Sequence, residues 1–277
     1  MNNFELNKIY NESCLDTMKR MPDNFIDLTI TSPPYDNLRA YKDDVGNDWS
    51  FETFKPIAEE LFRVTMLGGV VVWVVGDATI NGSESGTSFR QALYFMECGF
   101  NLHDTMIYEK NGASYPANDN SNRYSQVFEY MFVFSKGKPK TSNLIKDKKN
   151  RWSGSKSFGS KSNRNQEGDL QVQSRTETSE YGYRNNIWKY NNGFGYSTKD
   201  KEAFEHPAIF PEKLAADHIF TWSNEFDIVY DCFMGSGTTA KLSHEYKRNW
   251  IGSEISKEFV DLANKRLKPY LTQTKLF

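Results

Sequence analysis

The amino-acid sequence predicts an α/β fold with a mainly parallel sheet, interrupted by one inserted lobe. Apolar runs typical of buried strands alternate with segments of helical periodicity up to about residue 135, and the alternation returns after residue 204. The stretch between them is rich in Lys, Asn, Ser and Gly and poor in aliphatic residues. We therefore expect a core formed by residues 1–136 and 204–277, with a separate basic region at residues 137–203.

The first half of the core begins with a strand and a stiff loop. Residues 25–30 form a mainly apolar run that is typical of a buried strand, and Pro33 and Pro34 end this strand because proline donates no hydrogen bond to a ladder. The loop places the Ser32 hydroxyl, proline-flanked carbonyls and the Tyr35 ring at the carboxyl edge of the sheet, where open α/β sheets bind ligands. Two acceptors beside an aromatic face suit a planar group that carries an NH2, such as a nucleobase. The alternative is a plain strand-ending turn.

The remaining elements of this half follow from periodicity. They are a helix over 51–66 stopped by Gly68-Gly69, a buried strand over 70–75, a helix over 89–98, a strand over 105–109 and a strand over 128–134. The last strand is predicted to be antiparallel, because too few residues precede it for a helical crossover. Asp77, just after the second strand, is either an extra acceptor near the site or a capping residue.

The second half of the core contains a glycine turn between a strand and a helix. Gly235, Gly237 and Ala240 match the G-x-G-x-x-G/A spacing, in which the first glycine allows a tight turn, the second a close ligand approach, and Ala240 close packing. Glu254 follows Gly237 by 17 residues and falls at the end of the next strand, where a carboxylate can accept hydrogen bonds from two ribose hydroxyls. The pattern predicts a cofactor that contains a nucleoside. The predicted elements here are a helix over 212–220, a strand over 227–231, a helix over 238–246, a strand over 250–255 and a helix over 257–267.

The sequence argues against several cofactors, against a metal site and against a membrane location. No Gly-Lys-Ser/Thr follows the glycines, so a phosphate-binding P-loop is excluded. A nicotinamide dinucleotide would need a second mononucleotide half from earlier in the chain, whereas S-adenosylmethionine has one adenosine and no pyrophosphate. Cys14, Cys98 and Cys232 are far apart and form no zinc pattern, so we expect no metal. The polar N-terminus and the lack of an 18-residue apolar run predict a soluble, cytoplasmic protein.

Charge is distributed very unevenly. Between Lys136 and Arg164 lie ten basic residues and one acidic residue, a net charge of +9, so the rest of a chain with net charge −2 carries −11. This asymmetry is typical of a protein in which one basic region binds nucleic-acid phosphates. The alternative is that the basic region is only a solvated linker. Trp152 and Phe158 within the run favour contact with nucleic acid. The predicted DNA-binding residues are Lys146, Lys148, Lys149, Arg151, Lys156, Lys161 and Arg164.

These motifs together resemble a known family. A Ser-Pro-Pro-Tyr loop, then a basic variable stretch, then a Phe-x-Gly-x-Gly-Thr-Thr turn is similar to the β group of amino-methylating DNA methyltransferases, usually partners in restriction-modification. The resemblance implies a Rossmann-like fold with a seven-stranded, mainly parallel and circularly permuted sheet, S-adenosylmethionine as cofactor, and target recognition by residues 137–203. It also implies a prokaryotic or phage protein that binds double-stranded DNA as a monomer or homodimer, with a cognate restriction endonuclease as a candidate partner whose existence the sequence leaves open.

The resemblance also assigns roles to residues. The Ser32 hydroxyl and the Pro33 carbonyl would orient the exocyclic amine, and Tyr35, which follows Pro34, would stack on the flipped base. The segment 206–211 matches the one that lies over the methionine end of the cofactor. The cofactor-binding residues assigned in this way are Thr31, Phe210, Pro211, Asp231, Phe233, Gly235, Ser236, Gly237, Thr238 and Glu254.

The reaction expected is direct transfer of a methyl group to an exocyclic amine. Ring-carbon methylation of cytosine needs a nucleophilic cysteine, typically preceded by proline, and none of the three cysteines follows a proline. Within the family, Ser at the first loop position favours the 4-amino group of cytosine, so Ser32 predicts cytosine-N4 methylation. The alternatives are adenine-N6 methylation, methylation of RNA or a protein amide, and a catalytically idle DNA-binding protein.

Overall fold

The computed structural model describes residues 4–34, 49–113, 117–119, 121–156, 161–165, 167–173, 177–193, 195–206, 209 and 211–272. The chain forms two compact units. The first, which we call the core unit, comprises Met1–Asn143 and Asn186–Phe277, and the second, the basic unit, is Leu144–Asn185. The basic unit is shorter than the predicted region 137–203, because the residues on either side of it belong to the core unit.

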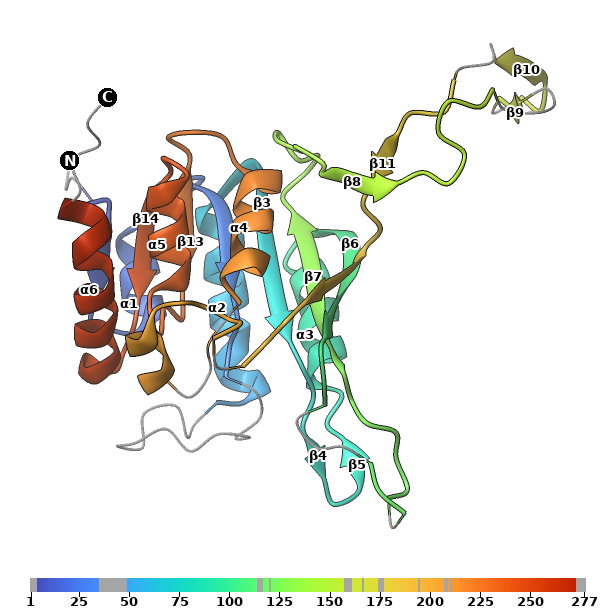
Figure 1. Ribbon diagram of the computed structural model, residues 1–277. Coiled ribbons are helices and arrows are strands. Elements are labelled where there is room, and N and C mark those ends of the chain that lie inside the picture. Colours follow the sequence, from blue (N-terminus) through green and yellow to red (C-terminus); the bar gives the residue numbers. More distant parts are fainter. Residues whose placement is uncertain are drawn as a thin grey trace. The chain divides into compact units, whose positions relative to one another are not determined.

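The core unit is built on one large sheet, which has eight strands among the described residues (Figure 1). In spatial order the strands are β1 (Lys8–Tyr10), β14 (Asn249–Ser253), β13 (Ile228–Asp231), β2 (Ile26–Thr31), β3 (Thr65–Val75), β7 (Phe128–Ser135), β6 (Asn101–Lys110) and β12 (Ile187–Tyr190). Only β7 among them runs against its neighbours, as predicted for residues 128–134. The sheet is mainly parallel, with one strand more than the seven expected. The extra strand at the edge is β12, which pairs in parallel with β6.

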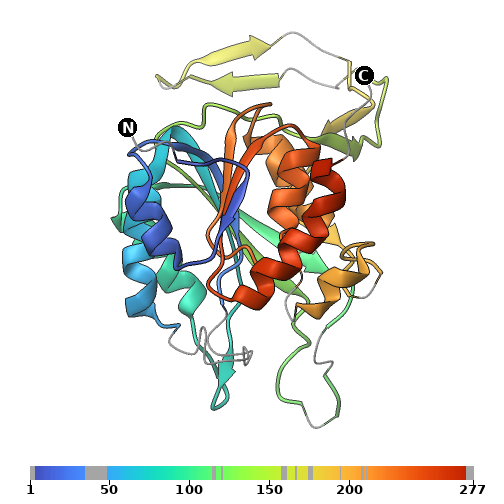
Figure 2. The ribbon, with the colours of Figure 1, turned by 90° about the vertical axis from the view of Figure 1, so that its left-hand side faces the viewer.

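Helices cover both faces of this sheet. Figure 2 shows one group of helices on each side: α1 (Cys14–Arg20), α2 (Phe51–Val64) and α3 (Thr87–Glu97) on one face, and α4 (Glu212–Trp222), α5 (Thr238–Glu245) and α6 (Lys257–Thr272) on the other. The central strands β2 and β3 are buried on both faces, which explains their continuous apolar runs. Across the described ranges, no helix is both long and apolar enough to cross a bilayer.

Predicted helix boundaries were wrong in places: α6, which we expected over residues 257–267, continues to Thr272. The helix that we expected to run to residue 66 and to stop at Gly68-Gly69 ends at Val64, and β3 starts at the next residue. The Thr65 hydroxyl donates to the Leu61 carbonyl at 2.6 Å and closes the helix there. Gly68 instead lies inside β3 with φ +81°, and its N–H donates to the Lys136 carbonyl at 2.7 Å.

The basic unit contains two short antiparallel ribbons. One pairs β8 (Lys146–Lys149) with β11 (Tyr181–Tyr183), and the other pairs β9 (Lys161–Arg164) with β10 (Leu170–Gln173). The Arg184 N–H donates to the Ile145 carbonyl at 2.9 Å, which continues the first ribbon to the ends of the unit. The chain therefore enters and leaves the basic unit through two adjacent strands.

Candidate active site

The two sequence motifs meet at one edge of the sheet. β2 and β13 are parallel neighbours, with Leu28 opposite Val229, so their carboxyl ends lie side by side. Beyond these ends, Ser32 and Gly235 line the same cavity of about 570 Å³. This volume lies within the range of small-molecule sites. Residues separated by about two hundred positions are therefore brought together, as the proposed chemistry requires.

A buried carboxylate connects the ends of the two strands. Asp231 is 6% exposed and accepts hydrogen bonds from the hydroxyls of Thr31 and Thr239, both at 2.7 Å, and from the Phe233 N–H at 3.1 Å. Burial raises the pKa of Asp231, while these three hydrogen bonds oppose the rise. Asp231 thus fixes the end of β2 against the start of α5. Thr31 and Asp231 line the cavity, but their polar atoms also bond to each other, so both position the site.

The glycines of the turn have different surroundings. Gly235 and Gly237 have φ of +51° and +80°, values that L side chains rarely adopt. A Cβ on Gly235 would lie 3.0 Å from Nε2 of His206, whereas a Cβ on Gly237 would lie 3.0 Å from Cβ of Ala263. Gly235 lines the cavity and Gly237 does not. The second glycine, predicted to allow close ligand approach, instead allows α5 to pack closely on α6.

The Glu254 carboxylate lies in the cavity wall directly after β14. Its Oε2 accepts from the Gly235 N–H and its Oε1 from the Ser256 N–H, both at 2.9 Å. Burial raises the pKa of Glu254 against these hydrogen bonds. Each carboxylate oxygen can accept a second hydrogen bond, so two ligand hydroxyls can be bound at once. Nε1 of Trp49, another cavity residue, is buried without a hydrogen-bond partner among the described residues. This set of groups fits a nucleoside cofactor with a polar tail.

The predicted catalytic loop lines the same cavity. Ser32, Pro33 and Pro34 all contribute to its wall, as do Pro211, Phe233, Ser236 and Thr238 of the predicted cofactor set. Tyr35 and Phe210 lie outside the described residues. Asp77 takes the capping role left open by the sequence. It accepts hydrogen bonds from the N–H and hydroxyl of Ser88 at the start of α3.

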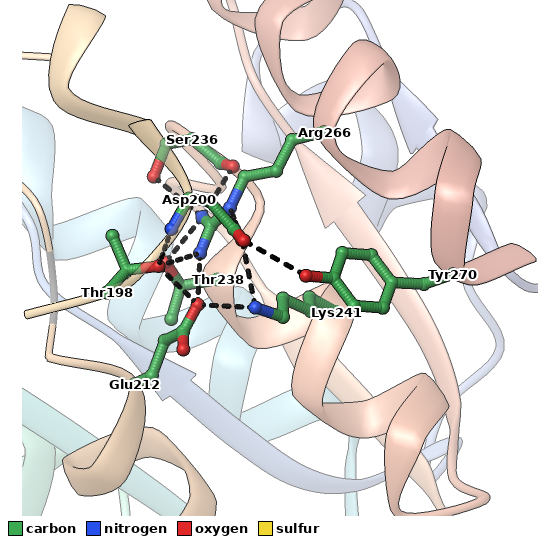
Figure 3. Close-up of polar contacts among 8 residues, drawn as sticks. All are labelled: Thr198, Asp200, Glu212, Ser236, Thr238, Lys241, Arg266 and Tyr270. Carbon is green, nitrogen blue, oxygen red and sulfur yellow. Dashed lines mark hydrogen bonds and ion pairs between the residues drawn. The ribbon is translucent and has the colours of Figure 1, made fainter. Parts of the chain in front are cut away.

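A buried polar cluster that the sequence did not predict contacts the glycine turn at Ser236 (Figure 3). The Arg266 guanidinium, on α6, is 1% exposed and contacts the carboxylates of Asp200 and Glu212 at 2.8 and 2.6 Å. It also donates to the Ser236 carbonyl at 3.0 Å. Lys241, on α5, contacts the same two carboxylates at 2.8 and 2.7 Å. We call these residues, with Thr198, Thr238 and Tyr270, the Arg266 cluster.

The Arg266 cluster fixes the chain segment that follows β12. Asp200 and Glu212 flank His206, Ile209 and Pro211, which line the cavity. Burial alone would raise the pKa of Asp200, but hydrogen bonds from Lys241 and Arg266 outweigh it and lower the pKa to about 2. Both carboxylates are thus held against two helices, and the cavity-lining segment is tied down at each end.

A second part of the cavity wall was also missed. It comes from the ends of β6, β7 and β12 and contains Tyr108, Lys110, Glu129 and Asn192. The Lys110 ammonium lies 2.5 Å from Glu129 Oε1, and each side chain is 17% exposed. No local motif marks these residues, because the sheet brings them together from different strands.

The predicted DNA-binding residues lie in the basic unit. Lys146, Lys148, Lys149, Arg151 and Lys156 are exposed, and Lys146 lies over the ring of Tyr183 with its Nζ 4.8 Å from the centroid. Lys161 and Arg164 lie on β9, and their side chains are outside the described part of the structure.

Comparison with known proteins identifies the family. The family model described as DNA methylase, of the N6 and N4 type, matches residues 26–265. The chain is 59% identical over 247 residues to "Orphan methyltransferase M.BamHII" of Bacillus amyloliquefaciens, covering 89% of this chain and 90% of the relative. The chain belongs to the N6/N4 DNA methylase family.

Solved structures show the same fold. The cytosine-N4-specific PvuII DNA methyltransferase matches 98% of this chain and 87% of its own, with a TM-score of 0.69 and 18% identity. The M1.HpyAVI-SAM complex matches 94% of this chain and 99% of its own, with a TM-score of 0.59 and 24% identity. The predicted methyltransferase fold is confirmed, and family membership confirms the predicted cofactor, S-adenosylmethionine. The protein is therefore an amino-methylating DNA methyltransferase.

Proposed function

We propose that this methyltransferase modifies the 4-amino group of cytosine within a specific duplex DNA sequence. The observation that carries the proposal is that Ser32 and Glu254 line one cavity. A serine at the first position of the loop is the family pattern for cytosine, whereas Asp or Asn is the pattern for adenine. The cytosine-N4 specificity of the PvuII enzyme, which shares the fold, agrees with this choice.

The proposed cofactor contacts use the groups already described. Glu254 would accept hydrogen bonds from both ribose hydroxyls while its other lone pairs stay bound to the Gly235 and Ser256 N–H groups. The Phe233 ring and the segment around Ile209 and Pro211 supply nonpolar walls. When bound, S-adenosylmethionine supplies a methyl group activated by its sulfonium. The residues of the chain would position the methyl group against the target amine and exclude water from the cavity.

The catalytic part of the proposal concerns orientation of the amine. The exocyclic amine of cytosine is a poor nucleophile, because its lone pair is delocalised into the ring. The Ser32 hydroxyl and the Pro33 carbonyl would accept hydrogen bonds from its two hydrogens and favour a pyramidal amine whose lone pair faces the methyl group. Asp231 maintains this geometry indirectly, since its bond to Thr31 fixes the residue before Ser32. Transfer would then be an in-line displacement that depends on positioning. The amine nitrogen would bond to the methyl carbon as the carbon–sulfur bond breaks, the thioether would leave, and the amine would release one of its protons to solvent.

The proposed partners are DNA and a restriction endonuclease. They follow from the positive charge of the basic unit and from the names of similar proteins. The basic unit is proposed to bind the phosphates of the duplex and to help select the target sequence. Relatives such as "Type II methyltransferase M.BglII" of Bacillus subtilis, 26% identical over 272 residues, suggest a restriction-modification setting. The relative that is 59% identical is described as an orphan methyltransferase. We therefore propose double-stranded DNA as the partner of this chain and a cognate restriction endonuclease as a second candidate partner.

The chemical product tests the proposal. Unmethylated plasmid DNA is incubated with the protein and isotopically labelled S-adenosylmethionine, and the nucleosides are separated by mass analysis. N4-methylcytosine is expected, whereas N6-methyladenine would overturn the cytosine assignment. Mapping the modified positions gives the target sequence.

Ser32→Ala tests the loop. We expect turnover to fall by about 100-fold or more, the scale seen when one polar group that acts in the transition state is removed. Affinity for S-adenosylmethionine, measured by calorimetry, should stay within about twofold, because the Glu254 side of the cavity is unchanged. Ser142→Ala, at an exposed serine outside the cavity lining, is the control. Equal losses of turnover and cofactor affinity in Ser32→Ala would count against an orienting role.

A further inference from the structure

The cavity divides into two sides around the serine loop. In the sheet order, β13 and β14 lie on one side of β2, and β3, β7, β6 and β12 lie on the other. The glycine turn and Glu254 follow the strands of the first side. Lys110 ends β6, and Glu129 is the second residue of β7. Because β7 runs antiparallel, its beginning meets the carboxyl end of β6, so Lys110 and Glu129 border the cavity opposite the cofactor side.

Lys110 and Glu129 form an ion pair in the wall of the cavity. Tyr108 is opposite Glu129 in the register, and alternate residues of a strand share a face, so Lys110 lies on the same face as both. The pairing of β6 with β7 is already continued by the Lys110 N–H, which donates to the Val127 carbonyl at 2.7 Å. A partly buried ion pair adds little stability, because desolvation offsets the attraction between the charges. Its place in the cavity wall points to a role in ligand binding.

We propose that Lys110, oriented by Glu129, binds the Watson–Crick edge of the flipped base and favours cytosine over adenine. An ammonium has three donors, and Glu129 occupies one of them. The other two match the adjacent N3 and O2 acceptors of cytosine, which lie beside its 4-amino group. Adenine presents N1 beside its amine but a C–H in the place of O2, so it satisfies one donor fewer. This inference rests on the proposed function, since it requires the base to reach Ser32.

The control comes from the neighbouring pair of strands, β6 and β12. Lys189 of β12 pairs with Glu109 of β6 at 2.6 Å, and its side chain is 64% exposed. Glu109 lies between Tyr108 and Lys110 in sequence, so the Lys189–Glu109 pair is on the opposite face of the sheet. Lys189→Met therefore removes an equivalent ammonium without changing the cavity wall.

The test pairs Lys110→Met with a base that lacks one acceptor. Duplexes carry the mapped target with either cytosine or 3-deazacytosine, in which a C–H replaces N3, at the methylated position. For the unaltered protein and for Lys189→Met, kcat/KM should be about 10- to 100-fold lower on the analogue, the scale of one hydrogen bond to a charged group. Lys110→Met should show that loss already on cytosine and little further loss on the analogue. Its affinity for S-adenosylmethionine should be unchanged.

The alternative outcomes are distinct. If Lys110→Met and the analogue reduce kcat/KM by independent factors that multiply, Lys110 does not bind N3 and the inference is overturned. If Lys110→Met does not fold, Lys110→Arg serves instead. It keeps the charge and the donors, so it should remain sensitive to the analogue, and insensitivity would overturn the inference. The product formed by the unaltered protein separately tests the proposed function: N6-methyladenine would overturn it, whereas N4-methylcytosine with independent factors overturns only the role of Lys110.

Discussion

Glu254, the residue proposed to bind the ribose, has a carboxylate whose orientation is fixed by its own backbone contacts. Two backbone N–H groups hold its carboxylate in place, and burial raises its pKa above the ordinary value of 4.5. In the free protein a raised pKa means that the folded state prefers the protonated acid, so the contribution of Glu254 to stability increases as the pH falls. Cofactor binding should respond in the opposite direction, because the ribose contacts proposed here need the charged carboxylate as acceptor.

Glu254→Gln is the first prediction at the residue scale. Affinity for S-adenosylmethionine should fall by about tenfold at neutral pH, since an amide has one acceptor oxygen in place of two. In the unaltered protein, affinity should weaken as the pH is lowered towards about 5, whereas in Glu254→Gln this dependence should be absent. Calorimetric titrations across this pH range test both expectations. The same pH slope in the two proteins would refute the assignment of Glu254 to the ribose.

At the scale of the element, the Arg266 cluster joins a segment without regular strands to two helices. The cluster should matter for stability because a buried carboxylate that loses its cation is costly. Arg266→Met removes one of the two cations that contact Asp200 and Glu212, so we expect the free energy of unfolding to fall by about 3–5 kcal/mol. Urea-induced unfolding measures the difference.

Lys257→Met is the matched change on the same helix. The Lys257 ammonium pairs with Asp261 at the surface, where both side chains are more than half exposed. Such a pair contributes at most about 1 kcal/mol, so the variant should unfold almost like the unaltered protein. Equal effects of the two substitutions would mean that the Arg266 cluster is no more important than a surface pair.

The elements differ in how far the sequence could predict them. The strands β2, β3 and β7 were predicted because long apolar runs dominate their sequences. Within the large sheet two short strands were missed, because each depends on a distant partner. β1 pairs with β14, and β12 contributes only Trp188 and Tyr190 to the interior.

The site could be predicted only where its chemistry is local in sequence. Ser32, Gly235 and Glu254 belong to short motifs with a fixed spacing, and the structure brings all three to one cavity. Arg266 and Asp200, in contrast, are 66 positions apart and carry no motif. The Lys110–Glu129 pair likewise exists only after the register of β6 and β7 is known.

At the scale of the whole molecule, we expect the basic unit to bind DNA and the core unit to bind the cofactor. We predict that replacing Lys146, Lys148 and Lys149 with glutamine weakens DNA binding and flattens its dependence on salt. Each lost phosphate contact should reduce the slope of log affinity against log salt by about 0.9. Fluorescence anisotropy at several salt concentrations measures the slope.

Cofactor binding is the internal control for this variant. The three lysines are exposed residues of the basic unit, and every described residue that lines the cavity belongs to the core unit. Affinity for S-adenosylmethionine should therefore be unchanged. An unaltered salt slope would mean that these charges are only solvated, and that the duplex is held elsewhere.

The beginning and the end of the chain share a small hydrophobic cluster, in which Ile9 of β1 joins Leu267 of α6. A gene whose reading frame opened within residues 144–185, and whose old ends were fused by a short spacer, would encode the glycine turn first and the serine loop last. The same cavity would still assemble, because β2 and β13 would remain neighbours. The cavity therefore depends on the spatial order of the strands and not on the order in which its two motifs are translated.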